Sequence, residues 1–196
     1  MLSLDTLDKL YDIAEAQSGY FTAAQATAAS VDRRRLAHFA STGRLQRIRR
    51  GIYRLTHFPR SRHEDLAIAW LETGPHSVIS HDSALTLYDL SDIMPASIHV
   101  TVPRTASRRR HGYRLHTNQI GPADITSFEG MAVTTVPRTI VDVALDGLSD
   151  EFVEQAACQA VQQGLTSVEL LLAEADRRSR SLGQLLRQML TQGGLL

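Results

Sequence analysis

Most of the positive charge in this 196-residue sequence is gathered in two short arginine-rich segments. Residues 33–62 hold ten arginines and residues 104–114 hold five, and neither segment contains an aspartate or a glutamate. The rest of the chain has six basic and 21 acidic side chains, although the formal net charge is zero. All basic residues except Lys9 are arginines, but codon bias can produce that preference, so only the clustering of charge is informative. This segregation predicts a polyanion-binding surface on an otherwise acidic protein.

An alternative interpretation is that these arginines only solvate the protein surface. Ten like charges within one small segment repel one another unless a ligand neutralises them. We therefore favour nucleic acid as the ligand of residues 33–62.

A second group with chemically capable side chains is Ser80-His81-Asp82-Ser83, which contains the residue types of a hydrolytic triad. Such triads join residues from remote parts of a chain, and neighbours on one segment cannot assume that geometry. We expect Ser80 to be the N-cap of a helix over residues 82–88 instead. No catalytic residues can be named elsewhere, so the sequence does not predict an enzyme.

The eight histidines and the single cysteine do not have the spacing of a metal site. No pair shows His-x3-His or Cys-x2-Cys spacing, and His57, His63, His76 and His81 fall on different predicted elements. A glycine-rich phosphate loop is also absent from the sequence. We therefore expect no metal and no cofactor. Cys158 lies in an apolar helical pattern and is expected to be a buried structural thiol.

The elements that must position the first arginines are three helices followed by a hairpin. Ser3, Thr22 and Asp32 are suitable N-caps for helices, and the last of these helices should run to Thr42. Apolar residues then alternate with arginines on both sides of a turn at Arg50-Gly51, which predicts a two-stranded wing. This order is typical of a winged helix-turn-helix domain, which we assign to residues 1–60.

A helical wheel on the third helix separates a packing side from a basic side. Leu36 and Phe39 share the packing side with Asp32 and Ala40. In a helix-turn-helix the second helix enters the major groove and its early residues meet base edges. The wing then contacts the phosphate backbone or the minor groove. The predicted DNA-binding residues are Arg33, Arg34, Arg35 and His38 on the helix, with Arg47, Arg49 and Arg50 in the wing.

The composition changes near residues 60–62, where we place the boundary to a second domain at 63–196. Short strand-like segments around residues 77–79, 97–102, 113–117, 125–128 and 131–134 predict a small sheet, and residues 137–190 are helical in pattern. The whole chain is therefore expected to be α+β. Arg104, Arg108, Arg109 and Arg110 lie between two of these strands; they could contact DNA, bind a partner or only solvate a loop. Arg138 and Asp142 are expected to form a weak surface ion pair within one helix, worth about 0.3–0.5 kcal/mol.

The cellular location follows from apolar content and cysteine usage. Apolar residues make up 43 % of the chain, but none of its apolar runs approaches the roughly 18 residues needed to cross a membrane. A single cysteine suits a reducing compartment, so the cytoplasm is the expected location and no membrane is expected as a partner.

Taken together, these segments resemble the AbiEi-type antitoxins of type IV toxin–antitoxin systems. The resemblance rests on Gly43-Arg44-Leu45, Arg49-Arg50-Gly51-Ile52-Tyr53, Ile79-Ser80-His81-Asp82-Ser83-Ala84-Leu85, Ile98-His99-Val100-Thr101-Val102-Pro103 and Val133-Thr134-Thr135-Val136-Pro137-Arg138-Thr139-Ile140-Val141-Asp142. It implies a winged helix that binds duplex DNA at repeats in its own promoter. It also implies a second domain that suppresses a nucleotidyltransferase-like toxin, directly or functionally.

Two other functions are considered beside this one. Some chains similar to this one carry a fused restriction-type nuclease, which usually needs a catalytic lysine, but the only lysine here is Lys9 in the first helix. We expect that nuclease to be absent. The alternative to an antitoxin is a winged-helix transcription regulator whose second domain senses a ligand or dimerises, without a toxin partner.

Overall fold

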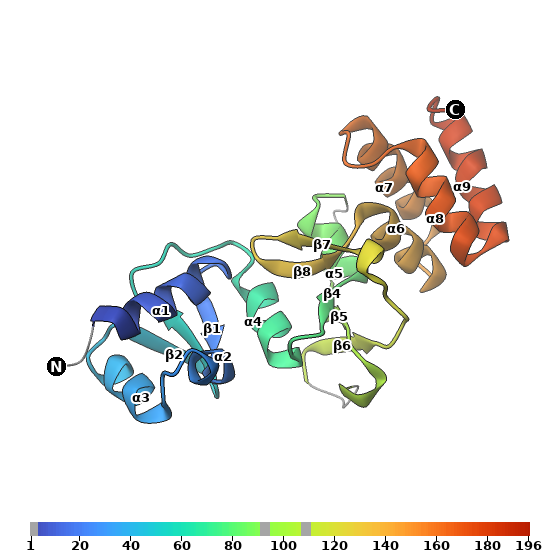
Figure 1. Cartoon of the computed structure of the whole chain (residues 1–196). Coiled ribbons are helices and arrows are strands. Elements are labelled where there is room, and N and C mark those ends of the chain that lie inside the picture. Colours follow the sequence, from blue (N-terminus) through green and yellow to red (C-terminus); the bar gives the residue numbers. More distant parts are fainter. Residues whose placement is uncertain (1–3, 91–94, 107–110) are drawn as a thin grey trace. The chain divides into compact units, whose positions relative to one another are not determined.

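The computed structural model describes residues 4–90, 95–106 and 111–196 (Figure 1). The chain forms two compact units, one made of Met1–Ser77 with Ser127–Met131 and the other of Val78–Thr126 with Ala132–Leu196. Both contain helices and strands, which confirms the α+β class. The separate domains at 1–60 and 63–196 stay a prediction. Ser3, expected to cap the first helix, lies outside the described residues.

The first unit begins with a helix-turn-helix followed by a hairpin, as expected for a winged helix. Its elements are α1 (Leu4–Glu15), β1 (Tyr20–Thr22), α2 (Ala23–Ala28), α3 (Arg33–Ser41), β2 (Leu45–Arg49), β3 (Ile52–Leu55) and α4 (Glu64–Thr73). The strand β1 was not expected. It pairs antiparallel with β3 on the side opposite β2, so the wing is part of a three-stranded sheet.

Local capping fixes the helix-turn-helix as predicted. The Thr22 side chain accepts a hydrogen bond from the Gln25 amide at 3.1 Å, and the Thr22 amide donates one to Oε1 of Gln25 at 2.8 Å. Asp32 accepts from the Arg35 amide at 2.8 Å and so caps α3. Each cap satisfies donors that the first turn of a helix leaves unpaired.

The core of the first unit joins α1, α2 and α3 to the sheet. Leu36 and Phe39 project from α3 into this core, which confirms the packing side of the helical wheel. The buried apolar residues are Leu10, Ala14, Phe21, Ala26, Val31, Leu36, Phe39, Leu45 and Leu55. Because α3 is anchored by these contacts, its opposite side has a fixed orientation on the unit.

The remaining elements form a five-stranded sheet and five helices in the described part of the chain. They are β4 (Val78–Ile79), α5 (His81–Leu87), β5 (Ile98–Thr101), β6 (Tyr113–His116), β7 (Ile125–Phe128), β8 (Met131–Thr134), α6 (Val136–Leu145), α7 (Asp150–Gln162), α8 (Val168–Arg178) and α9 (Arg180–Gln192). Two short 3₁₀ segments, Arg104–Ala106 and Pro122–Asp124, connect strands. All five predicted strand segments are present.

The sheet has the strand order β6-β5-β4-β8-β7 and mixes parallel with antiparallel pairs. β5 runs parallel to β6, β4 runs antiparallel to β5, and β4 runs parallel to β8. Glu129 and Gly130 both have positive φ between β7 and β8. That conformation suits a tight hairpin turn and explains the glycine there.

Helices α5 to α9 share one apolar core in the second unit. Ile140, Ala157, Leu171 and Leu186 are fully buried in it and come from α6, α7, α8 and α9. Cys158 is partly buried at this core and burial raises the pKa of its thiol, in keeping with a packing role. Within residues 4–90, 95–106 and 111–196, no helix is long and apolar enough to cross a membrane.

Candidate functional site

The outward side of α3 gathers the basic residues that the sequence analysis selected. Arg33, Arg34, Arg35 and His38 are all exposed, while the neighbouring Leu36 is buried. A shallow hollow of about 390 Å³ is lined by Arg34, Arg35, His38 and Asp32. Asp32 was expected on the packing side, but as the N-cap it has left the helical path and is exposed. The helix therefore presents one basic side, with a carboxylate at its start.

The three arginines predicted in the wing are all exposed, and one of them is paired with a carboxylate. Arg47 and Arg50 are exposed, on β2 and at the turn. Arg49 is exposed as well, but its guanidinium forms a 2.8 Å ion pair with Glu72 from α4. Because this pair lies within the first unit, it neutralises part of the charge that Arg49 could offer to a phosphate.

Arg54 differs from the other arginines of the basic segment because it is almost completely buried. It lies on β3, donates a hydrogen bond to the Phe58 carbonyl, and its guanidinium carbon is 5.8 Å from the centre of the Tyr20 ring. That distance allows a cation–π contact. Burial, together with a hydrogen bond to Glu64, raises the pKa of Tyr20 to about 12. One of the ten arginines thus stabilises the unit and is not part of its surface.

The second arginine segment is only partly described. Arg104 is exposed in a 3₁₀ turn, whereas Arg108, Arg109 and Arg110 lie outside the described residues. Arg114 is exposed on β6 and pairs with Asp146, at the end of α6, at 3.0 Å. A single polyanion-binding surface from Arg104 to Arg114 stays a prediction.

Ser80 occupies the N-cap position of α5, but its side chain does not cap the helix. Its hydroxyl accepts a 2.8 Å hydrogen bond from Thr101 and lies 3.0 Å from Nδ1 of His81. Ser80 therefore has the predicted position, but the prediction that its side chain caps the helix was wrong. Its hydroxyl instead contacts Thr101 of β5 and the neighbouring His81.

Three histidines from three elements, two of them buried and His116 half-buried, form a cluster beside Ser80. The rings of His81 and His116 stack with centres 3.5 Å apart, and the His99 ring lies 5.1 Å from that of His116. His81 has φ +51°, a conformation that costs about 1–3 kcal/mol in residues other than glycine. Burial lowers the pKa of His81 to about 2 and of His116 to about 4, and it lowers the pKa of His99 as well. All three rings are therefore neutral near pH 7.

Arg138 and Asp142 form a buried ion pair, where a weak surface pair was expected. Arg138 Nε lies 2.8 Å from Asp142, and its Nη1 lies 3.1 Å from Asp124. Arg177 and Arg178 of α8 also contact Asp124. Arg138 is 1 % exposed. The i,i+4 spacing along α6 correctly predicted the partner, but not the burial, which depends on the segment holding Asp124 and on α8.

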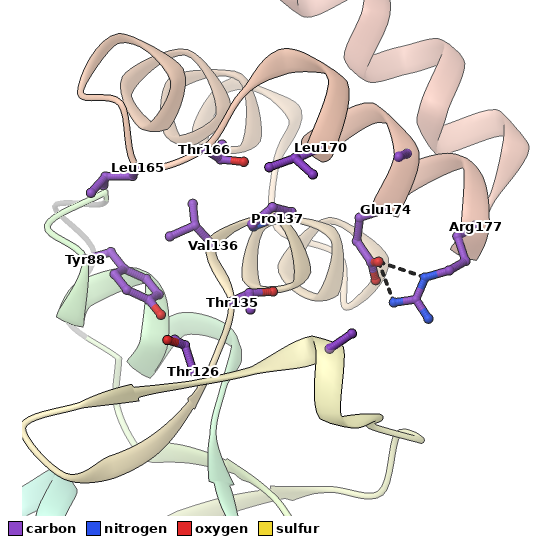
Figure 2. A pocket seen from close by; sticks show the side chains of 12 residues that line it. Tyr88, Thr126, Thr135, Val136, Pro137, Leu165, Thr166, Leu170, Glu174 and Arg177 are labelled. Carbon is purple, nitrogen blue, oxygen red and sulfur yellow. Dashed lines mark hydrogen bonds and ion pairs between the residues drawn. The ribbon is translucent and has the colours of Figure 1, made fainter.

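A pocket in the second unit lies between α8 and the start of α6. It has a volume of about 590 Å³, and Figure 2 shows Leu170 and Glu174 of α8 facing Val136 and Pro137. Leu165 and Leu170 are 42 % and 62 % exposed at its margin. Glu174 and Arg177 pair with each other at one end (Figure 2). The lining is mixed, because half of its twelve residues are apolar and the other half carry a hydroxyl group or a charge.

Comparison with known proteins finds one family model that matches part of the first unit. Residues 8–56 match the family model described as "Transcriptional regulator, AbiEi antitoxin". The match covers about a quarter of the chain and includes α2, α3 and both wing strands. It confirms the resemblance to AbiEi-type antitoxins in that segment. No curated protein matches the sequence.

Proposed function

We propose that this protein is a DNA-binding transcriptional regulator of the antitoxin type that represses its own operon and suppresses a nucleotidyltransferase-like toxin. The observation that carries the DNA-binding part is the exposed basic side of α3, with Arg33, Arg34, Arg35 and His38 on a helix anchored by Leu36 and Phe39. The family match over residues 8–56 supports regulation as its purpose.

The side chains on α3 are suited to base recognition. An arginine donates two parallel hydrogen bonds to the O6 and N7 atoms of guanine, and each good bidentate contact is worth about 1–3 kcal/mol of discrimination. Arg34 and His38 are exposed and lie opposite the buried side of α3 on the helical wheel, so we assign them to base edges. Arg33 and Arg35 flank them and are assigned to phosphate or base.

The wing is suited to sequence-independent affinity. Arg47 and Arg50 are exposed on the hairpin, where guanidinium groups can pair with phosphates without reporting on base identity. Arg49 already shares its charge with Glu72. We therefore expect Arg49 to contribute less than Arg47 and Arg50.

The two roles predict opposite effects of two sets of substitutions. Arg34→Ala and His38→Ala should each reduce the preference for promoter repeats over a scrambled duplex by about 1–3 kcal/mol. Arg47→Ala and Arg50→Ala should weaken binding to both duplexes equally. Fluorescence anisotropy with labelled 30-base-pair duplexes measures both constants.

A matched control for these substitutions is Arg180→Ala, which removes the same charge from an exposed site at the start of α9. It should change the dissociation constants for the promoter duplex and the scrambled duplex only slightly and by the same factor, because it alters the overall charge of the protein but not the DNA-binding side. Loss of specificity through the wing variants, with specificity kept in Arg34→Ala and His38→Ala, would contradict the assignment of roles.

Suppression of a toxin is proposed for the second unit on the strength of the family resemblance. We expect a nucleotidyltransferase-like reading frame directly downstream, and growth of cells that coexpress its product with the full chain tests this part. We expect rescue by the full chain, and rescue should persist with Arg34→Ala and Arg50→Ala because these side chains belong to the DNA-binding side. Absence of rescue by well-expressed protein would contradict the antitoxin assignment.

The second candidate is a winged-helix regulator that senses a small ligand, and the pocket of about 590 Å³ favours it. A volume of this size suits a drug-sized molecule. Ala173 is exposed at the pocket, so Ala173→Trp should fill it without opening the core. A change in repression of a promoter reporter by Ala173→Trp, together with no toxin rescue by the wild-type chain, would favour ligand sensing over toxin suppression.

A further inference from the structure

The sheet register brings two histidines together that are 17 positions apart in the sequence. β5 and β6 are parallel, with His99 opposite Arg114 and Thr101 opposite His116. Paired residues in adjacent strands point to the same side of a sheet, and so do residues two apart in one strand. His99 and His116 therefore project from the same face of the sheet as diagonal neighbours.

Asp146 reaches the same place from the end of α6. One ligand atom each of His99, His116 and Asp146 lies within 4.8 Å of the other two. Two imidazole nitrogens and one carboxylate oxygen are a donor set that zinc and similar ions accept. Asp146 is the C-cap of α6, and the partial negative charge at that helix end favours a cation.

The two imidazoles also have nitrogen atoms that the protein does not use. Nδ1 of His99 and Nε2 of His116 are buried, and neither has a hydrogen-bond partner in the described part of the chain. The His99 side chain is 96 % buried. Leaving buried polar atoms unpaired costs about 1–3 kcal/mol each, so a ligand that accepts their lone pairs would relieve this cost.

We propose that His99, His116 and Asp146 form a binding site for a divalent transition metal ion of the zinc class, with water completing its coordination. Asp82 lies 3.6 Å from Nε2 of His99, where it can orient the ring as carboxylates do behind many metal-bound histidines. His81 stacks on His116 and holds that ring in place.

One neighbouring group opposes the ion, and it is Arg114. Its guanidinium contacts both carboxylate oxygens of Asp146, at 3.2 and 3.0 Å. The Arg114 side chain is 53 % exposed, so it can move into solvent when the carboxylate turns toward the ion. A tetrahedral zinc ion with bonds of about 2.0–2.1 Å holds its ligand atoms roughly 3.3 Å apart. The ligand atoms now lie within 4.8 Å of one another, and the exposed Asp146 side chain can move to bring its oxygen atom to the shorter distance.

The test is a zinc titration of the full chain after treatment with a chelator. A chromophoric chelator competes for the ion, and we expect one Zn²⁺ per chain with a dissociation constant in the micromolar range or below. His116→Gln and Asp146→Asn should each weaken zinc binding by at least about tenfold, since even residues behind the ligands change affinity by 10–100-fold. Substitution of Co²⁺ should give visible absorption bands that both variants lose.

Asp146→Asn keeps the inference testable, because Asp146 is exposed and the change preserves shape. Circular dichroism should confirm that this variant is folded. His76→Gln is the matched control, since His76 is exposed and lies outside the cluster; it should bind zinc as the wild type does. Absence of zinc binding at micromolar concentrations would overturn the proposal. So would zinc binding that both site variants retain at full affinity.

Discussion

Replacement of Arg138 by methionine is expected to lower the free energy of unfolding by about 3–5 kcal/mol. Arg138 is buried between two carboxylates, Asp142 at 2.8 Å and Asp124 at 3.1 Å. Methionine fills a similar volume but leaves Asp142 as an uncompensated buried charge. Burial raises the pKa of Asp142, whereas the hydrogen bond and charge of Arg138 lower it. Loss of the guanidinium therefore removes the main group that stabilises the charged carboxylate. Urea unfolding followed by circular dichroism measures the effect.

The control for this variant is Arg187→Met. Arg187 pairs with Asp176 in the same unit, but the two side chains are 44 % and 39 % exposed. Exposed pairs contribute about 0–1 kcal/mol, so this change should be small. The double variant Arg138→Met with Asp142→Leu should recover much of the loss, because a buried ion pair can often be replaced by apolar residues. Equal effects of Arg138→Met and Arg187→Met would contradict the buried network.

Binding of a scrambled duplex is expected to weaken about a thousandfold between 50 and 200 mM salt. The basic residues on α3 and the wing must displace condensed counterions at each phosphate that they contact. If six contacts form, the slope of log K against log salt should be about −5. Anisotropy titrations of the full chain at four salt concentrations measure this slope.

Removal of wing charges should reduce that dependence. Arg47→Ala with Arg50→Ala should make the slope shallower by about two, since each phosphate contact contributes roughly one. Arg49→Ala should change it less, because Glu72 already pairs with Arg49. A slope near zero in the wild type would show that the arginine segment does not bind the phosphate backbone.

Most of the winged helix could be predicted because its signals are local. Thr22 and Asp32 cap the helices that follow them, and Leu36 and Phe39 are buried on one side of α3 as the wheel indicated. The three-residue strand Tyr20–Thr22 was missed because it is too short to show an alternating pattern. Its position depends on pairing with β3, which is remote in the sequence.

The features missed in the second unit depend on tertiary contacts. Metal-ligand spacing along the sequence reveals only histidines that are close together in the chain. His99 and His116 are far apart in the chain and meet through the pairing of β5 with β6. The strand patterns around both residues were visible, but their register was not. Arg138 was assigned to the surface because its second partner, Asp124, follows from the fold of another segment.

The burial of Arg54 also could not be predicted from the arginine-rich composition of its segment. Its place in an arginine-rich segment indicated a surface role, but the alternation along β3 points this side chain inward, where it meets Tyr20 and the Phe58 carbonyl. The exposed basic surface therefore has fewer arginines than the segment contains.

The central claim is that the basic side of α3 recognises a particular DNA sequence. The most direct measurement is the equilibrium dissociation constant of the full chain for a duplex taken from upstream of its own gene, compared with a scrambled duplex of identical composition at physiological salt. Specific regulators bind their sites about 10³–10⁷ times more tightly than other DNA, so we predict a ratio of at least about a thousand. Equal constants for the two duplexes would contradict sequence recognition by α3.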